Sequence, residues 1–219
     1  MNPLCYSPPP NCGIDLVYHD DSILVVNKPT GLLSVPGRGV DKQDCLSARI
    51  QKAFPDALIV HRLDMATSGL MVFARGVEIQ RRLSLMFQER KVEKRYVAVV
   101  KGKLEVDTGE INLPIITDWP NRPKQKVDTI IGKHSLTRYR LLIHDIDRHT
   151  SRIELEPITG RTHQLRIHMA AIGHPILGDK LYGGATSDNA ERLLLHARSL
   201  KFMHPLDENP MSWICDSPF

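Results

Sequence analysis

The chain has 219 residues, of which 42% are hydrophobic, and its formal net charge is +4. This length and apolar content are enough to bury a core without disulfides or metal, while the charge is too small to identify a nucleic-acid-binding protein by itself. Because no apolar run approaches the roughly 18 residues that would span a bilayer and the N-terminus has no signal-peptide pattern, we expect a cytoplasmic protein without a membrane segment.

The first 13 residues, MNPLCYSPPPNCG, form a proline-rich leader, which we expect to be disordered or to lie flat on the rest of the chain. Residues 14–219 are expected to form one domain, since no linker or internal repeat divides them. The cysteines are scattered and include no C-x-x-C pair, so the sequence indicates reduced thiols rather than a zinc site or a disulfide framework. They are Cys5, Cys12, Cys45 and Cys215.

Strands and helices are both predicted in the first half of the domain. Apolar runs predict strands at residues 14–20, 22–29 and 70–75. Between the second and the third strand, Asp44 is expected to cap a helix that carries three apolar residues on one face. Gly76 opens a second helix after the third strand. The loop HRLDMATSG (61–69) therefore leads into a buried strand.

Consecutive strands dominate the second half. They are predicted at residues 94–102, 110–116, 135–146, 151–158 and 191–205. Before the last of them, Thr162 is expected to cap a helix with Leu165, Met169 and Ile172 on one face, and this helix ends at Gly173. Runs of strands with few helices favour an α+β fold with a mixed, mainly antiparallel sheet over a doubly wound α/β fold.

The segment TDWPNRPKQKV, residues 117–127, is predicted to be a basic loop. Its cations Arg122, Lys124 and Lys126 lie beside Trp119, and together they suit contact with phosphates and with an unstacked base. A solvated surface that happens to be basic has the same composition, so the segment alone leaves both interpretations open.

Few motifs in the sequence indicate a particular chemistry. His163 and His168 are five residues apart, so they do not share a helix face as a pair of metal ligands would. The sequence contains no nucleophile elbow, P-loop or dinucleotide-binding fingerprint. Asp64 stands beside hydroxyl residues, where an acid is ordinarily a helix cap or a turn residue. An enzyme with this sequence would have to work with a carboxylate and without a metal or cofactor.

Four motifs, in this order and with these gaps, resemble those of the RluA-type pseudouridine synthases: HRLDMATSG, KRYVAVVKG, ITGRTHQLRIHMAAIGHPILGD and RLLLHA. The resemblance includes VNKPTGLLSVPGR and runs from about residue 14 to the C-terminus. It implies a single catalytic domain with flanking helices and an RNA-binding cleft. Because only about 13 residues precede the first strand, no S4-like RNA-binding domain is expected. The basic loop looks most like that of the member that modifies both ribosomal and transfer RNA.

The resemblance assigns roles to particular residues. Asp64 matches the family's catalytic aspartate, and Tyr96 matches the tyrosine that stacks on the target uracil and assists proton transfer. Arg166 matches the arginine that pairs with the aspartate, and Leu165 matches an aliphatic residue that lines the pocket. An arginine beside a partly buried carboxylate favours its ionised form and so opposes the effect of burial.

RNA contacts are expected from residues near these positions. We expect Arg62, next to Asp64, to hold or replace the flipped base, and His61 and the three cations of the basic loop to contact RNA. No metal, cofactor or protein partner is expected, and the protein is expected to act as a monomer.

The expected reaction is isomerisation of uridine to pseudouridine, with Asp64 as nucleophile, in the anticodon stem-loop of certain tRNAs and in a hairpin loop of 23S rRNA. Hairpin loops suit this reaction because the base leaves its stack there at the lowest cost. Two alternatives are a synthase acting on a single ribosomal or transfer RNA and an RNA-binding protein without activity. A third is a uracil-directed glycosylase or other RNA hydrolase.

Overall fold

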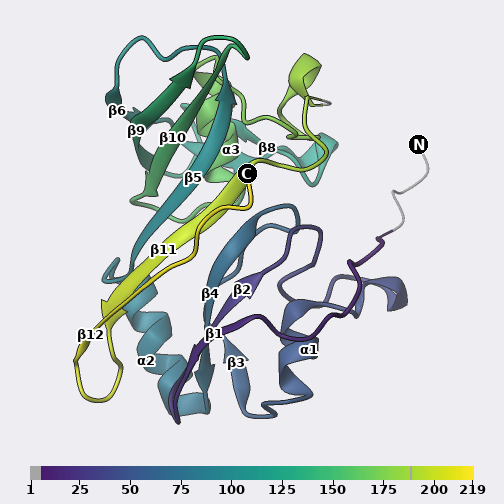
Figure 1. The fold of residues 1–219 in the computed structure, drawn as a ribbon, viewed down its shortest axis with the longest axis vertical. Helices are drawn as coiled ribbons and strands as arrows, with labels where there is room; N and C mark the ends of the chain where they lie inside the picture. The colour runs from purple at the N-terminus through teal and green to yellow at the C-terminus, as the bar shows by residue number, and fades with distance from the viewer. Residues whose placement is uncertain (1–5, 188) are drawn as a thin grey trace. The chain divides into compact units, whose positions relative to one another are not determined.

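A computed structural model describes residues 6–187 and 189–219, and it divides the chain into two compact units (Figure 1). Unit 1 contains the N-terminal part up to Glu93 together with Ala197–Ser217. Unit 2 contains Lys94–His196 and the last two residues. Strand β11 (Leu195–Met203) begins in unit 2 and continues in unit 1. None of the helices among the described residues is long and apolar enough to cross a membrane.

Unit 1 is built on antiparallel strand pairs, with β2 joining β1 to β4 and with β3 also pairing with β4. The strands are β1 (Leu16–His19), β2 (Ile23–Lys28), β3 (Ala57–Ile59), β4 (Ser68–Arg75) and β12 (Pro210–Ile214), the last of which pairs with β11. Strands β2 and β4 are buried almost throughout because their continuous apolar runs are covered on both faces.

Two α-helices belong to unit 1: α1 (Leu46–Gln51) and α2 (Val77–Gln88). Helix α2 follows Gly76, whose φ of 80° is a conformation that suits glycine. Its buried residues Ile79 and Leu83 belong to the same core cluster as Val72 of β4 and Phe202 of β11. The core of unit 1 therefore lies where β2, β4, β11 and α2 meet.

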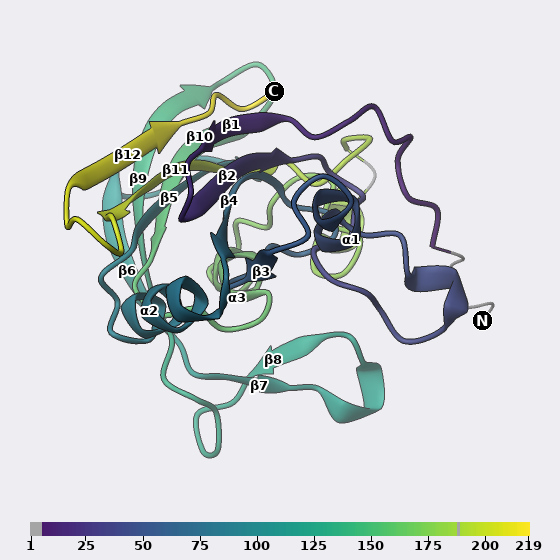
Figure 2. The ribbon, with the colours of Figure 1, turned by 90° about the horizontal axis from the view of Figure 1, so that it is seen from below.

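Unit 2 is a four-stranded antiparallel sheet in the order β5-β10-β9-β6, with one α-helix and a separate hairpin. Its strands are β5 (Glu93–Lys101), β6 (Thr108–Asn112), β7 (Ile115–Thr117), β8 (Gln125–Val127), β9 (Leu136–Asp145) and β10 (Thr150–Pro157). Helix α3 (Gln164–Ala171) contacts β9 and β10, and also β8 of the β7–β8 hairpin. Figure 2 shows α3 between this sheet and the hairpin.

These elements confirm the predicted α+β class, and most predicted strands and helices are found within a few residues of their expected bounds. The predicted strand 110–116 is instead two strands, β6 and β7, which are separated at Leu113 and Pro114 because proline has no N–H to donate to a ladder. The predicted basic loop forms part of the β7–β8 hairpin and includes a short 3₁₀ helix, Trp119–Asn121. Strands β3 and β12 were not predicted.

Both predicted helix caps are wrong. Helix α1 starts after Cys45, and the carboxylate of Asp44 instead bonds the guanidinium of Arg49 at 2.7 Å. Helix α3 starts after His163, which has a left-handed backbone with φ of 56°, and no side chain caps it in the manner expected of Thr162. Two further 3₁₀ turns complete the secondary structure of the described residues, at Val40–Lys42 and Gly184–Thr186.

The described part of the leader contacts the start of α1. The hydroxyl of Tyr6 donates to the carbonyl oxygen of Asp44 at 2.9 Å and accepts the N–H of Leu33 at 3.0 Å. The guanidinium of Arg49 donates to the carbonyl oxygen of Pro9 at 2.7 Å. Cys12, Cys45 and Cys215 are free thiols, and Cys5 lies outside the described residues.

Candidate active site

The loop that carries Asp64 connects β3 to β4 in unit 1, and Asp64 is half-buried. A second segment, residues 28–34, fixes the backbone on both sides of it. On the N-terminal side, the hydroxyl of Ser34 donates to the carbonyl oxygen of Leu63 at 2.6 Å and accepts the N–H of the same residue at 3.2 Å. Within the loop, Thr67 donates its N–H to the carbonyl oxygen of Asp64 at 3.1 Å.

The C-terminal side of the loop is held by three donors. The carbonyl oxygen of Met65 accepts the N–H of Gly31 at 2.8 Å and the ammonium of Lys28 at 3.1 Å. Lys28 is fully buried, so its charge interacts with this carbonyl away from water, where such an interaction is strong. The hydroxyl of Thr30 donates to the carbonyl oxygen of Ala66 at 2.7 Å. The backbone around Asp64 is therefore fixed on both sides.

His61 and Arg62 precede Asp64 and differ in their surroundings. The Nε2 atom of His61 accepts the N–H of Val72 in β4 at 3.0 Å, and its ring stacks on Phe87 of α2 with centroids 4.6 Å apart. His61 thus attaches the loop to both β4 and α2. Arg62, in contrast, is exposed to solvent.

Tyr96 lies on β5 of unit 2 and is half-buried. Its partner across the strand pair is Leu155 of β10, which is fully buried, and side chains at directly opposed positions share a face of the sheet. The preceding residue, Arg95, points to the other face and bonds Glu154 at 3.2 Å. The alternation of β5 therefore separates Tyr96 from the charged residues of the opposite face.

Arg166 lies on α3 of unit 2 and is 5% exposed. The carboxylate of Asp179, which is fully buried, accepts hydrogen bonds from its Nε and Nη2 atoms, both at 2.7 Å. Such a bidentate, charge-assisted pair fixes the plane of a guanidinium as well as its position. Burial raises the pKa of Asp179, but the hydrogen bonds and charge of Arg166 outweigh it, so this pKa lies below its ordinary value.

Two other polar residues hold α3 against β9. The side-chain amide of Gln164 donates to the carbonyl oxygen of Leu136 and to the hydroxyl of Thr137, both at 3.0 Å. One turn later, His168 contacts the same hydroxyl through Nδ1 at 2.9 Å. Its Nε2 lies 2.9 Å from the carbonyl oxygen of Leu113, which can only accept, so Nε2 carries the proton. Gln164 and His168 thus fix the helix that presents Arg166.

Leu165, the predicted pocket residue, is next to Arg166 on α3 and is 7% exposed. The predicted RNA-contacting cations lie on the basic hairpin, defined here as residues 115–127. Arg122, Lys124 and Lys126 are all exposed. The guanidinium of Arg122 lies 4.2 Å from the ring centroid of Trp119, which is 66% exposed. The hairpin therefore presents an aromatic ring and three cations to solvent.

Comparison with known proteins identifies the family to which this chain belongs. The family model described as RNA pseudouridylate synthase matches residues 22–171, which is more than half of the chain. This chain belongs to the RNA pseudouridylate synthase family. The matched residues include parts of both units and contain Asp64, Tyr96 and Arg166.

Among other members of the RNA pseudouridylate synthase family, the dual-specificity RNA pseudouridine synthase RluA of Escherichia coli is 48% identical over 98% of both chains. The protein of the same name from Vibrio cholerae is 50% identical over 91% of this chain and 81% of its own. The solved structure of human RNA pseudouridylate synthase domain containing 1 matches with a TM-score of 0.80 and 30% identity, over 97% of this chain and 87% of that one.

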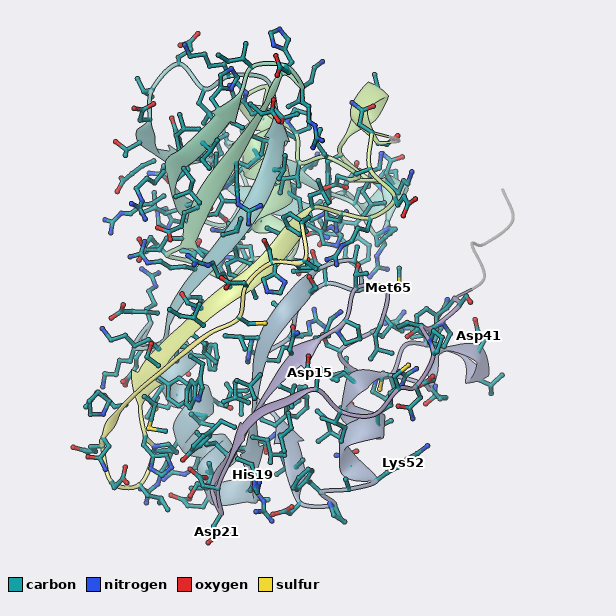
Figure 3. All side chains as sticks on the ribbon, in the orientation of Figure 1. Asp15, His19, Asp21, Asp41, Lys52 and Met65 are labelled. Atoms are coloured by element: carbon teal, nitrogen blue, oxygen red, sulfur yellow. The ribbon has the colours of Figure 1, made fainter. Side chains whose placement is uncertain are left out.

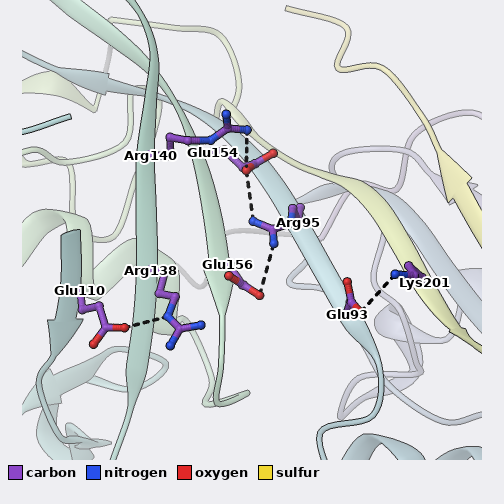
Figure 4. Close-up of polar contacts among 8 residues, drawn as sticks. All are labelled: Glu93, Arg95, Glu110, Arg138, Arg140, Glu154, Glu156 and Lys201. Carbon is purple, nitrogen blue, oxygen red and sulfur yellow. Dashed lines mark hydrogen bonds and ion pairs between the residues drawn. The ribbon is translucent and has the colours of Figure 1, made fainter. Parts of the chain in front are cut away.

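This member of the RNA pseudouridylate synthase family also has a charged face on the sheet of unit 2 (Figure 4). The buried carboxylate of Glu154 accepts hydrogen bonds from Arg95 at 3.2 Å and Arg140 at 3.0 Å, and Arg138 bonds Glu110 at 2.7 Å. A hollow of about 180 Å³ is lined by Arg95, Arg138, Tyr139, Arg140, Glu154 and Glu156. The cations and carboxylates of this face alternate and bond each other, so its charges are paired within the sheet.

Sequence reasoning missed several residues that support the predicted ones. Asp64, Tyr96 and Arg166 were named from motifs, but Ser34, which fixes the loop around Asp64, was not. Asp179 was quoted within a motif without a role. The sequence shows an acid directly after a glycine, a pair typical of a tight turn, and this signal could have drawn attention to Asp179; in the structure that glycine has φ of 72°.

Proposed function

We propose that this protein isomerises uridine to pseudouridine in transfer RNA and ribosomal RNA, within the anticodon stem-loop of certain tRNAs and a hairpin loop of 23S rRNA. One observation carries the proposal: 48% identity over 98% of both chains to an enzyme named for dual specificity. The fixed backbone around Asp64 supports it, because a reacting group held in place lowers the entropic cost of the reaction.

The reaction breaks the bond between N1 of uracil and C1′ of ribose, rotates the base, and forms a bond from C5 to C1′. C5 loses a proton and N1 gains one, so the composition does not change. Asp64, as a carboxylate, either attacks the sugar as a nucleophile or removes a sugar proton as a base. We propose that Tyr96 stacks on the uracil and assists the loss of the C5 proton, that Arg166 keeps Asp64 ionised, and that Leu165 lines the pocket.

RNA binding in this proposal depends on exposed groups in each unit. The target base has to leave its stack, at a cost of a few kcal/mol, and we propose that Arg62 holds or replaces it. In unit 2, Trp119 with Arg122 above it offers a stacking surface, and Lys124 and Lys126 offer phosphate contacts. We further propose that the protein acts in the cytoplasm, as a monomer, without a cofactor, metal or protein partner.

The test is release of tritium from RNA labelled at C5 of uracil. Transfer RNA and ribosomal RNA transcripts are incubated with the protein without added metal, and the modified positions are then mapped. Asp64→Asn should abolish release while leaving the urea midpoint of unfolding close to that of the parent. A matched control is Asp41→Asn, since Asp41 is exposed in the 3₁₀ turn Val40–Lys42 of unit 1, where Figure 3 labels it, and should keep full activity.

Each alternative has its own outcome in this assay. Free uracil among the products would indicate a glycosylase. Tritium release from only one of the two RNAs would contradict dual specificity. Release from neither RNA, with RNA binding retained, would indicate an RNA-binding protein without activity. Full activity of the Asp64→Asn variant would show that the Asp64 carboxylate has no role in the reaction.

A further inference from the structure

The turn formed by residues 179–182 contacts Arg166 in two ways. Asp179 bonds the guanidinium, and its Oδ1 atom also accepts the N–H groups of Leu181 at 2.9 Å and Tyr182 at 3.1 Å. These bonds tie the carboxylate to the backbone of its own turn. The ring of Tyr182 lies under the guanidinium, with the Cζ atom of Arg166 5.2 Å from the ring centroid, a distance typical of cation–π contact.

The hydroxyl of Tyr182 reaches in another direction, toward the basic hairpin. It accepts the N–H of Gln125 in β8 at 2.8 Å. It also lies 2.7 Å from the Nδ1 atom of His163, the left-handed residue immediately before α3. One half-buried side chain thus contacts the hairpin through its oxygen, the start of α3 through the same oxygen, and Arg166 through its ring.

We propose that Tyr182 is a positioning residue that couples the basic hairpin to Arg166. RNA held by the hairpin cations restrains β8, and the Tyr182 hydroxyl transmits that restraint to the turn and helix that orient the guanidinium. A tyrosine suits this task because its long rigid side chain has only two rotatable bonds between backbone and hydroxyl. This inference rests on the proposed function, because it gives Arg166 its role in the reaction.

Tyr182→Phe tests the coupling with little risk to folding, since it removes one oxygen and keeps the ring under Arg166. In single-turnover tritium release, the parent and variant are compared by RNA affinity and by the rate at saturating RNA. Loss of the two hydrogen bonds of the Tyr182 hydroxyl should weaken RNA affinity by about tenfold and slow the saturated rate by a similar factor. Tyr139→Phe, which removes a tyrosine hydroxyl from β9, is the matched control and should change neither quantity.

A double-mutant cycle with Lys124→Ala separates coupling from a merely structural role. In the parent background, loss of this hairpin cation should weaken RNA binding and also slow the saturated rate, because the hairpin no longer restrains Tyr182. In the Tyr182→Phe background, the same substitution should weaken binding alone. An equal effect of Lys124→Ala on the saturated rate in both backgrounds would overturn the proposal, as would a Tyr182→Phe variant with parental kinetics.

Hydrogen exchange gives a readout that does not depend on turnover. Adding tRNA to the parent should slow amide exchange in the basic hairpin and in the first turn of α3, and in Tyr182→Phe it should slow exchange in the hairpin only. Slowing in both elements of the variant would also overturn the coupling. If the parent protects both elements but releases no tritium, the proposed function fails while the coupling stands; if it releases tritium without protecting α3, the reverse holds.

Discussion

Ser34→Ala should lower both the stability of unit 1 and the reaction rate. The hydroxyl of Ser34 donates to and accepts from the backbone of Leu63, and Ser34 is 4% exposed, so alanine removes both bonds where water has little access. An unsatisfied buried polar group costs about 1–3 kcal/mol, so we expect the free energy of unfolding to fall by about 2–4 kcal/mol. In a chain of this size, that lowers Tm by about 5–15 °C.

The effect on activity follows from the position of Leu63, which directly precedes Asp64. A displacement of about 1 Å at a reacting group can cost about a hundredfold in rate, so we expect single-turnover tritium release to slow by about 10- to 100-fold. The rate is measured at a temperature where urea titration shows both proteins fully folded. Ser47→Ala is the matched control, because Ser47 is also buried but its hydroxyl lies 3.3 Å from the thiol of Cys45 and, among the described residues, makes no hydrogen bond to the loop that carries Asp64.

Three results would refute this reasoning. An unchanged urea midpoint would mean that the two hydrogen bonds to Leu63 make no net contribution to the free energy of unfolding. A reduced midpoint with parental activity would mean that Asp64 keeps its position without the bonds from Ser34. An equal loss of activity in Ser47→Ala would attribute the effect to general destabilisation of unit 1.

Two further predictions concern stability. Gly69→Ala should lower the free energy of unfolding by about 2–5 kcal/mol, because Gly69 has φ of 113° and an added Cβ would clash with the backbone of Ala197; a parental urea midpoint would contradict this prediction. Burial lowers the pKa of His168 in the folded protein. The unfolded chain therefore binds a proton at His168 at a higher pH than the folded chain does, and the free energy of unfolding decreases as pH falls below about 6.5. His168→Gln should flatten this pH dependence, and equal slopes for the two proteins would refute the assignment.

The elements that were predicted correctly are those for which the residues within the element are enough to indicate its type and its burial. Strands β2 and β4 are largely apolar runs, a pattern that predicts strands buried on both faces, and the structure buries both of them. Helix α2 was also predicted, since Gly76 precedes it and its apolar residues Ile79 and Leu83 are four apart. Local composition was sufficient in each of these cases.

The wrong predictions are those in which a polar group has more than one possible partner. Thr162 resembles a helix cap, but the N–H of Arg161 donates to the side chain of Gln164 at 3.0 Å, and the chain enters α3 through a left-handed residue instead. Similarly, Asp44 precedes a helix and yet pairs with Arg49, which is also bonded to the leader. No local pattern reveals which of two possible partners a polar side chain takes.

In the motifs around Asp64 and Arg166, the neighbouring residues fix the segment that carries the central residue. Around Asp64, the neighbouring residues Leu63 and Met65 give their backbone groups to residues 28–34. Around Arg166, Gln164 and His168 give their side chains to β9, and the guanidinium itself is held by a turn 13 residues further on. In each motif one residue is proposed to react or to tune the reaction, while those beside it fix its backbone.

It follows that a substitution beside a proposed catalytic residue should act through geometry rather than through charge. Replacing a supporting residue such as Ser34 or Tyr182 should change the rate without moving the pH at which the reaction loses activity, because neither side chain is proposed to carry charge in the reaction. Replacing Asp64 or Arg166 should remove the reaction or move that pH. A comparison of pH–rate profiles therefore distinguishes the residues proposed to react from those that hold them in place.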